Sequence, residues 1–226
     1  PGRAYFLPAT GSPSIPIVTV NTDRVDLRIR RVAERNLLRA VQDQYFGRPL
    51  SPWQEDSFAD TVAEDIWTGT GEVANTINAE TTTRLPLDQA LAGLPAGIYA
   101  LQASVPDTDP YDVAPATQWF VISDLGFSTL QGNDGLHVFA RSLADTTPRA
   151  GVEVSVLSRS NRVLATDVTD ADGYLNVPPG FLAGTGGAEP ALIVLRDGES
   201  DISFMSLADP AFDLSDRGVT GRAPPE

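Results

Sequence analysis

Apolar and polar residues alternate near the start of the chain in a way that predicts β-strands. Ile17–Val20 forms one such stretch. From Val25 to Ile29 every second residue is apolar, and the residues between them are charged, as is Arg30. This period of two places the charged side chains on one face of a strand and the apolar ones on the other. Proline and glycine are frequent before these strands, so we expect residues 1–15 to be an extended lead-in.

Helical spacing interrupts the strands twice, over residues 36–46 and 52–62. Apolar residues in the first segment recur every three or four positions. In the second segment, Ser51 is placed to cap the helix and Pro52 to occupy its first position, while Phe58 would face inward. We therefore expect two short helices to be inserted in the first domain.

Strand signals return after the helices and complete the first half. We expect strands at Ile66–Gly69, Thr81–Leu87, Leu94–Val105 and Thr117–Ile122. The third is the clearest of them, because a turn of proline and glycine leads into it. Together these elements predict a first β-sandwich domain over residues 16–123.

The second half carries turns every eight to twelve residues, the spacing of an all-β sandwich. Counting a strand that begins near Leu125, about seven strands fit into roughly 85 residues. Ala191–Leu195 is a continuous apolar run among them. We expect a second sandwich over 124–210 and a linker over 211–226. The predicted fold is mostly β, with two tandem antiparallel β-sandwich domains that pack like a fibronectin type III domain.

Composition and charge limit the partners of the chain. It has 226 residues, with 30 acidic against 16 basic side chains and a formal net charge of −14. All the basic residues are arginine. Such a surface repels nucleic acid and anionic membrane.

Cysteine is absent, which excludes a disulfide framework and a thiolate nucleophile. No apolar stretch approaches the length of a membrane span, and no signal peptide opens the sequence, so we expect a piece of a longer protein.

Candidates for catalysis are few. His137 is the only histidine, and it lies in an alternating strand, where a hydrogen-bonded structural role fits better than a catalytic base. Gly184–Gly187 lacks the lysine that a phosphate-binding loop needs. Trp53, Trp67 and Trp119 are expected to fill a core or a domain interface rather than to form a sugar platform. We predict that the chain is not an enzyme and holds no cofactor.

Two acidic loops are candidates for a metal site. Three aspartates lie from Asp167 to Asp172, directly before Gly173, and three more lie in Asp107–Asp112. An EF-hand also needs a glutamate at its twelfth position and flanking helices, which the sequence lacks. Because Asp-Gly is a strong hairpin signal, we expect a structural hairpin at Gly173 and no metal, with weak calcium binding as the alternative at both loops.

Two segments couple an apolar stretch to a charged turn that contains glycine, ATQWFVISDLGF (116–127) and FDLSDRGVTGR (212–222). An aspartate after a serine can accept backbone N–H bonds in a turn, and glycine adopts positive φ without steric cost. Such turns would set the angle between consecutive domains. The predicted junction residues are Trp119, Ser123, Asp124, Gly126, Asp213, Ser215, Asp216, Arg217 and Gly218.

These two segments resemble the N-terminal part of bacterial alpha-2-macroglobulins, as does the Pro-Ala-Gly-Ile-Tyr strand start at 95–99. The resemblance implies two scaffold domains of a broad-spectrum periplasmic endopeptidase inhibitor, lipid-anchored in its full-length form. That inhibitor traps a protease after cleavage of a bait region. The implied partners are other macroglobulin domains of the same chain, with target proteases engaged only by the full-length protein, which we expect to be a monomer.

The machinery of that family is not found in this sequence. Many members carry a thioester formed from a cysteine and a glutamine, whereas this chain has no cysteine and no long exposed bait segment. The resemblance therefore assigns no functional residue beyond the junctions. Two alternatives remain open from the sequence: an Ig-like surface or adhesion module, and an accessory domain of a periplasmic enzyme.

Overall fold

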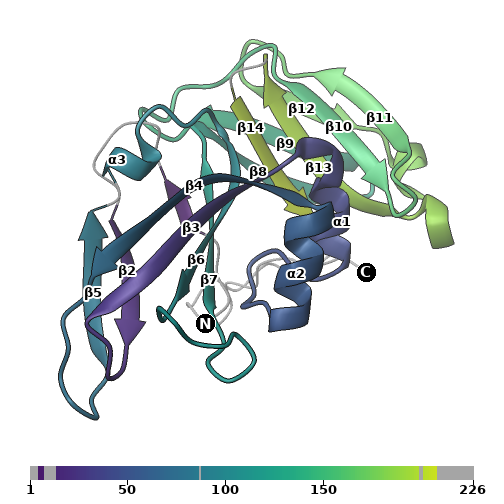
Figure 1. Ribbon diagram of the computed structural model, residues 1–226. Coiled ribbons are helices and arrows are strands. Elements are labelled where there is room, and N and C mark those ends of the chain that lie inside the picture. Colours follow the sequence, from purple (N-terminus) through teal and green to yellow (C-terminus); the bar gives the residue numbers. More distant parts are fainter. Residues whose placement is uncertain (1–4, 8–13, 87, 199–200, 208–226) are drawn as a thin grey trace, which may run out of the picture.

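The computed structural model describes residues 5–7, 14–86, 88–198 and 201–207 of the chain. Strands dominate, and they form four sheets, two in each half (Figure 1). The predicted mostly β fold with two tandem sandwiches is confirmed. Two short helices, α1 (Leu37–Gln42) and α2 (Pro52–Thr61), lie where the two halves meet (Figure 1).

The first sandwich pairs a large sheet with a small one. The large sheet has the strand order β1 (Tyr5–Leu7), β7 (Ala116–Ile122), β6 (Gly97–Ser104), β3 (Arg24–Val32), β4 (Ala63–Glu72). In the part of this sheet that the structure describes, β1 pairs in parallel with β7, and the other neighbours are antiparallel. The small sheet joins β2 (Ser14–Thr19) to β5 (Thr81–Pro86), and a short helix, α3 (Asp88–Leu91), follows it.

A hydrophobic core fills the space between these two sheets. Ile15 and Leu85 from the small sheet belong to the same buried cluster as Leu27, Ile29 and Tyr99 from the large one. The apolar positions predicted at every second residue of β3 therefore point into this core. The alternation holds because a strand exposes successive side chains on opposite faces.

The helices differ in how closely they follow the prediction. Ser51 caps α2 and forms a capping box with Gln54, and Pro52 opens the helix as predicted. Helix α1 ends at Gln42, earlier than its apolar spacing suggests, because Gln44 adopts a left-handed conformation with φ of 58°. Tyr45 is nevertheless buried, so its apolar spacing reflects packing beyond the end of the helix.

The second sandwich contains seven strands in the described residues. Its four-stranded sheet has the order β11 (Val163–Val168), β10 (Glu153–Ser158), β13 (Pro190–Asp197), β14 (Asp201–Ser206), and its three-stranded sheet the order β12 (Tyr174–Val177), β9 (Gly135–Ser142), β8 (Leu125–Gly132). A second core, including Val138, Val154 and Ile193, lies between the two sheets. Two short 3₁₀ helices, Pro179–Leu182 and Gly186–Ala188, connect β12 to β13.

The predicted hairpin at Gly173 is wrong. The local turn forms, with Gly173 at φ of 72° and two backbone N–H groups donating to the Asp170 carboxylate. However, β11 before the turn and β12 after it belong to different sheets. The chain crosses from one sheet of the sandwich to the other here. Turn chemistry decides the reversal of the chain, whereas the choice of partner strand depends on packing across the whole sandwich.

Candidate functional site at the joint between the two sandwiches

A third hydrophobic core spans both sandwiches, and we call it the joint core. Its buried members from the first sandwich are Val32, Leu37, Leu38, Ala40, Tyr45, Leu50, Phe58, Val62, Ile98, Ala100, Trp119 and Val121. Its buried members from the second are Ala191, Leu192, Val194, Ile202 and Phe204. Helices α1 and α2 thus bury side chains in one cluster with residues of β6, β7, β13 and β14.

Aromatic rings occupy the centre of the joint core. Phe46, which follows α1, has its ring centroid 5.3 Å from that of Trp119 and 4.9 Å from that of Phe204, both edge-to-face. Phe58 lies 5.1 Å from Trp119 in the same geometry. The Trp119 indole N–H donates to the backbone oxygen of Arg48 over 3.0 Å, so the ring is buried without leaving its polar atom unpaired.

Trp119 contributes to the joint core, whereas the other two tryptophans do not. Trp67 is partly buried against the first core. Trp53 is 69% exposed on α2, so it fills neither a core nor the joint in the described residues. The helical pattern around Trp53 could not show this exposure, because it does not say which part of the surface of α2 a neighbouring sheet covers.

The joint core explains the continuous apolar run Ala191–Leu195. Leu192 and Val194 face the joint core, whereas Ile193 and Leu195 face the core of the second sandwich. Strand β13 is therefore buried on both faces. A strand with one solvated face alternates between apolar and polar residues, while one buried on both faces reads as a continuous run. This run was the signal in the sequence for an interface between the sandwiches.

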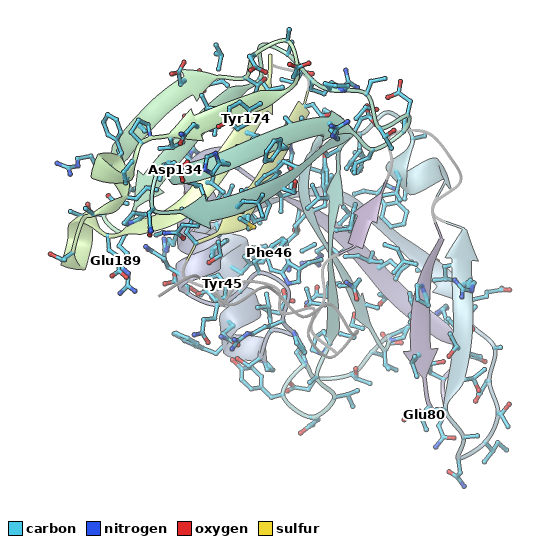
Figure 2. The ribbon with its side chains drawn as sticks, turned by 180° about the vertical axis from the view of Figure 1, so that it is seen from behind. Tyr45, Phe46, Glu80, Asp134, Tyr174 and Glu189 are labelled. Atoms are coloured by element: carbon cyan, nitrogen blue, oxygen red, sulfur yellow. The ribbon has the colours of Figure 1, made fainter. Side chains whose placement is uncertain are left out.

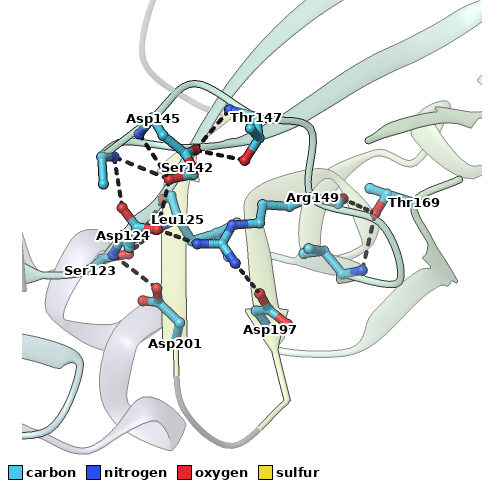
Figure 3. Close-up of polar contacts among 12 residues, drawn as sticks. Ser123, Asp124, Leu125, Ser142, Asp145, Thr147, Arg149, Thr169, Asp197 and Asp201 are labelled. Carbon is cyan, nitrogen blue, oxygen red and sulfur yellow. Dashed lines mark hydrogen bonds and ion pairs between the residues drawn. The ribbon is translucent and has the colours of Figure 1, made fainter. Parts of the chain in front are cut away.

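A polar cluster borders the joint, and Asp124 is at its centre (Figure 3). The Asp124 carboxylate accepts hydrogen bonds from the Ser142 hydroxyl at 2.9 Å and from the Ala144 N–H at 2.8 Å, and it forms an ion pair with Arg149. The backbone N–H of Asp124 donates to Asp201 at the start of β14 over 2.9 Å. The residue between the two sandwiches is therefore bonded to three separate segments of the second.

The turn at 123–126 is built differently from the prediction. The Ser123 hydroxyl, not the carboxylate of Asp124, accepts the local bond, from the Leu125 N–H at 2.9 Å. Gly126 does not have positive φ. Instead, a Cβ atom at Gly126 would overlap the side chain of Leu143. Glycine therefore leaves room for the Leu143 side chain as the two segments approach, which a local turn rule cannot detect.

The hydrogen bonds around the cluster shift the acidity of two carboxyl groups. Burial raises the pKa of Asp124, but the bonds from Ser142, Ala144 and Arg149 outweigh it, and the pKa is lower than usual. Bonds from the side chain and backbone of Thr147 are the main reason that the pKa of Asp145 falls to about 2. Both carboxylates are therefore held in the charged form that the cluster requires.

Further polar contacts link the two sandwiches around the joint core. Arg196 of β13 forms an ion pair of 2.8 Å with Glu34, which precedes α1. The Gln42 amide donates to the backbone oxygen of Arg159 over 2.8 Å. Within the second sandwich, Arg149 also lies 3.8 Å from Asp197 beside these contacts. An apolar centre with a polar rim is the usual anatomy of a specific interface.

The other sequence candidates lie apart from the joint. His137 is hydrogen-bonded to Tyr174 at 2.8 Å and to Asp134 at 3.1 Å, as expected for a structural histidine, and its bond lowers the pKa of Asp134. Among the described residues, no group of three or more His, Asp or Glu side chains is arranged to hold a metal ion. No helix in the described part of the chain is long and apolar enough to cross a membrane. The predicted second junction, residues 213–218, lies outside the described residues.

Two family models match the chain, one on each sandwich. Residues 2–120 match the model described as bacterial alpha-2 macroglobulin MG2 domain, and residues 122–224 match that of the bacterial alpha-2-macroglobulin MG3 domain. The chain is also 25% identical over 219 residues to alpha-2-macroglobulin of Escherichia coli K12 and 27% identical over 229 residues to that of Xylella fastidiosa 9a5c. These matches cover 97% and 99% of this chain but only 13% of each relative.

Solved structures share the fold of both sandwiches together. The crystal structure of native E. coli alpha-2-macroglobulin spanning domains NIE-MG1 matches with a TM-score of 0.72 and 23% identity, over 91% of this chain and 95% of that one. The trypsin-activated E. coli protein matches with a TM-score of 0.71 and 24% identity, over 95% of this chain and 14% of that one. The two-sandwich fold is thus present in both of those structures.

Proposed function

Because the chain belongs to the bacterial alpha-2-macroglobulin family, we propose that it is a scaffold section of an endopeptidase inhibitor. In this proposal its two domains hold each other at a fixed angle and break no bond themselves. The longer protein would be a broad-spectrum periplasmic inhibitor that traps a protease after cleavage of a bait region. Family membership favours this role over an adhesion module or an enzyme accessory domain.

The joint core is the observation that carries the proposal. Phe46, Trp119 and Phe204 pack in one cluster that draws on both sandwiches, and Asp124 bonds to segments on the far side of the junction. Two modules on a flexible tether would not need a shared apolar core. The likeness of the fold to native and to trypsin-activated E. coli structures supports a pair that keeps its arrangement in both forms.

A protease protection assay tests the scaffold role. The isolated chain, mixed with trypsin or elastase, is expected to leave digestion of a large protein substrate unchanged, whereas the longer protein should protect that substrate. In the longer protein, Phe204→Asp should reduce protection because it places a charge in the joint core. Met205→Asp is the matched control, since Met205 is the next residue on β14 and is 36% exposed.

Three results would contradict the proposal. Inhibition by the isolated chain would show that it acts on proteases directly. Equal protection by the Phe204→Asp and Met205→Asp proteins would show that the joint does not matter to the inhibitor. For location, recovery of the longer protein from the cytoplasm rather than the periplasm of fractionated cells would reject the periplasmic role.

A further inference from the structure

The end of the first sandwich that points away from the second carries exposed apolar residues. The β2–β3 turn and the β4–β5 loop meet at this end, and Glu80 lies at its extremity (Figures 1 and 2). Val18 is 57% exposed, Val20 is 50% exposed and Ile77 is 83% exposed. We call the two loops, with Val20 and Ile77 that they carry and Val18 near the end of β2, the tip.

Two asparagines fix the conformation of the tip. The Asn21 side-chain amide donates to the Asn78 side chain over 3.1 Å, and the Asn78 backbone N–H donates to the Asn21 side chain over 2.6 Å. Both residues are left-handed, with φ of 55° and 57°. Val20 and Ile77 directly precede these asparagines, so the two hydrogen bonds hold the backbones at Val20 and Ile77 near each other. A preorganised loop loses less conformational entropy when it binds a partner.

An acidic cleft adjoins the tip. It has a volume of about 610 Å³, and its lining includes the carboxylates of Asp23, Glu72 and Asp107 and one arginine, Arg24. The Val73 N–H donates to the backbone oxygen of Asp23 over 2.9 Å, which ties the β4–β5 loop to the wall of the cleft. With three carboxylates against one guanidinium, the cleft carries a net negative charge.

We propose that the tip is a docking surface for a protein segment that carries arginine or lysine beside apolar side chains. The apolar side chains of the partner would pack against Val20 and Ile77, and a cation would enter the acidic cleft. Charge complementarity selects this occupant over a second copy of the chain, because two copies with a net charge of −14 would bring like charges together. It also disfavours nucleic acid and anionic membrane as ligands.

The test uses two synthetic peptides of roughly 12 residues, a length that spans the tip. In one peptide leucine alternates with arginine, and in the other leucine alternates with glutamate. Titration of the labelled chain by NMR with the arginine peptide should shift amide signals in 20–24 and 72–78. The glutamate peptide should shift none of them. Adding about 0.5 M sodium chloride should weaken the binding, since salt screens charges at an exposed site.

Variants separate the tip from the rest of the acidic surface. Val20→Ser with Ile77→Ser should weaken binding of the arginine peptide by about fivefold, and Asp23→Asn with Glu72→Gln by a similar factor. Leu130→Ser is the matched control, because Leu130 is 64% exposed on the second sandwich. Equal binding of both peptides, shifts spread over the surface, or unchanged binding by the tip variants would overturn the proposal. So would a concentration-dependent dimer that Ile77→Ser abolishes, since the occupant would then be a second copy.

Discussion

At the scale of single residues, buried charges are satisfied by several partners each. Arg30 is 4% exposed beneath α2, where it pairs with Glu55, and its Nε donates to Asp65 over 2.7 Å. The second oxygen of Glu55 accepts the hydroxyl of Thr117. The charged face that the alternation predicts for β3 is therefore covered by a helix at this position. A buried pair of this kind is costly to break, because the remaining charge is left without compensation.

Glu55→Ala should lower the free energy of unfolding by about 3 kcal/mol, because Arg30 would keep only its partly exposed partner Asp65. Urea denaturation followed by circular dichroism measures the change. Glu64→Ala, an exposed acid close by in the sequence, should change stability by about 0.5 kcal/mol or less. Similar losses in the two variants would mean that the buried pair contributes little.

The lowered pKa of Asp124 predicts a dependence of stability on acid. A group whose pKa is lower in the folded state stabilises the fold above its unfolded pKa of about 3.9, and this stabilisation is lost as pH falls through the folded pKa. The free energy of unfolding should therefore decrease as pH falls below about 5, and it should decrease less in Asp124→Asn. Parallel pH profiles for the two proteins would rule out this contribution.

At the scale of elements, the segment that contains α1, Phe46 and α2 packs between the large sheet of the first sandwich and the four-stranded sheet of the second. It shares the joint core with β6 and β7 and reaches Phe204 on β14. Helices this short are marginal in isolation, so their stability comes from packing. Packing in the joint core therefore stabilises the helices, and the helices in turn supply buried side chains to the joint core.

Phe204→Ala should remove part of the joint core and cost about 3 kcal/mol, the usual loss for a buried phenylalanine. Met205→Ala, at the adjacent partly exposed position, should cost about 0.5 kcal/mol or less. Amide hydrogen exchange shows where the structure is weakened: in Phe204→Ala it should be faster in α1 and α2 than in the unmodified chain. Unchanged protection of both helices would argue that their packing does not depend on β14.

At the scale of the whole molecule, the described residues form three hydrophobic cores, one in each sandwich and one between them. The middle core makes the two sandwiches structurally dependent on each other. A pair joined in this way is expected to tumble and to unfold as a unit. This is the property that a scaffold section needs when neighbouring parts of a larger protein move.

Rigid pairing can be measured directly. One rotational diffusion tensor should fit the NMR relaxation data of both sandwiches, because the joint core prevents independent motion. In Phe204→Asp the sandwiches should separate into two bodies with shorter correlation times, since a buried charge disrupts the joint core. Independent tumbling in the unmodified chain would refute the rigid joint and remove the main support for the scaffold role.

Local rules were enough for much of the fold. The period of two predicts strand β3, capping chemistry predicts the start of α2 at Ser51, and the spacing of turns predicts the seven strands of the second sandwich. These signals depend only on neighbours within a few residues.

Packing between distant segments decided the rest. The chain crosses between sheets at Gly173, and Gly126 makes room for Leu143. Strand β13 is buried on both faces because one of them shares the joint core with side chains of α1, far away in the sequence. Such contacts join segments far apart in sequence, so no local pattern can specify them.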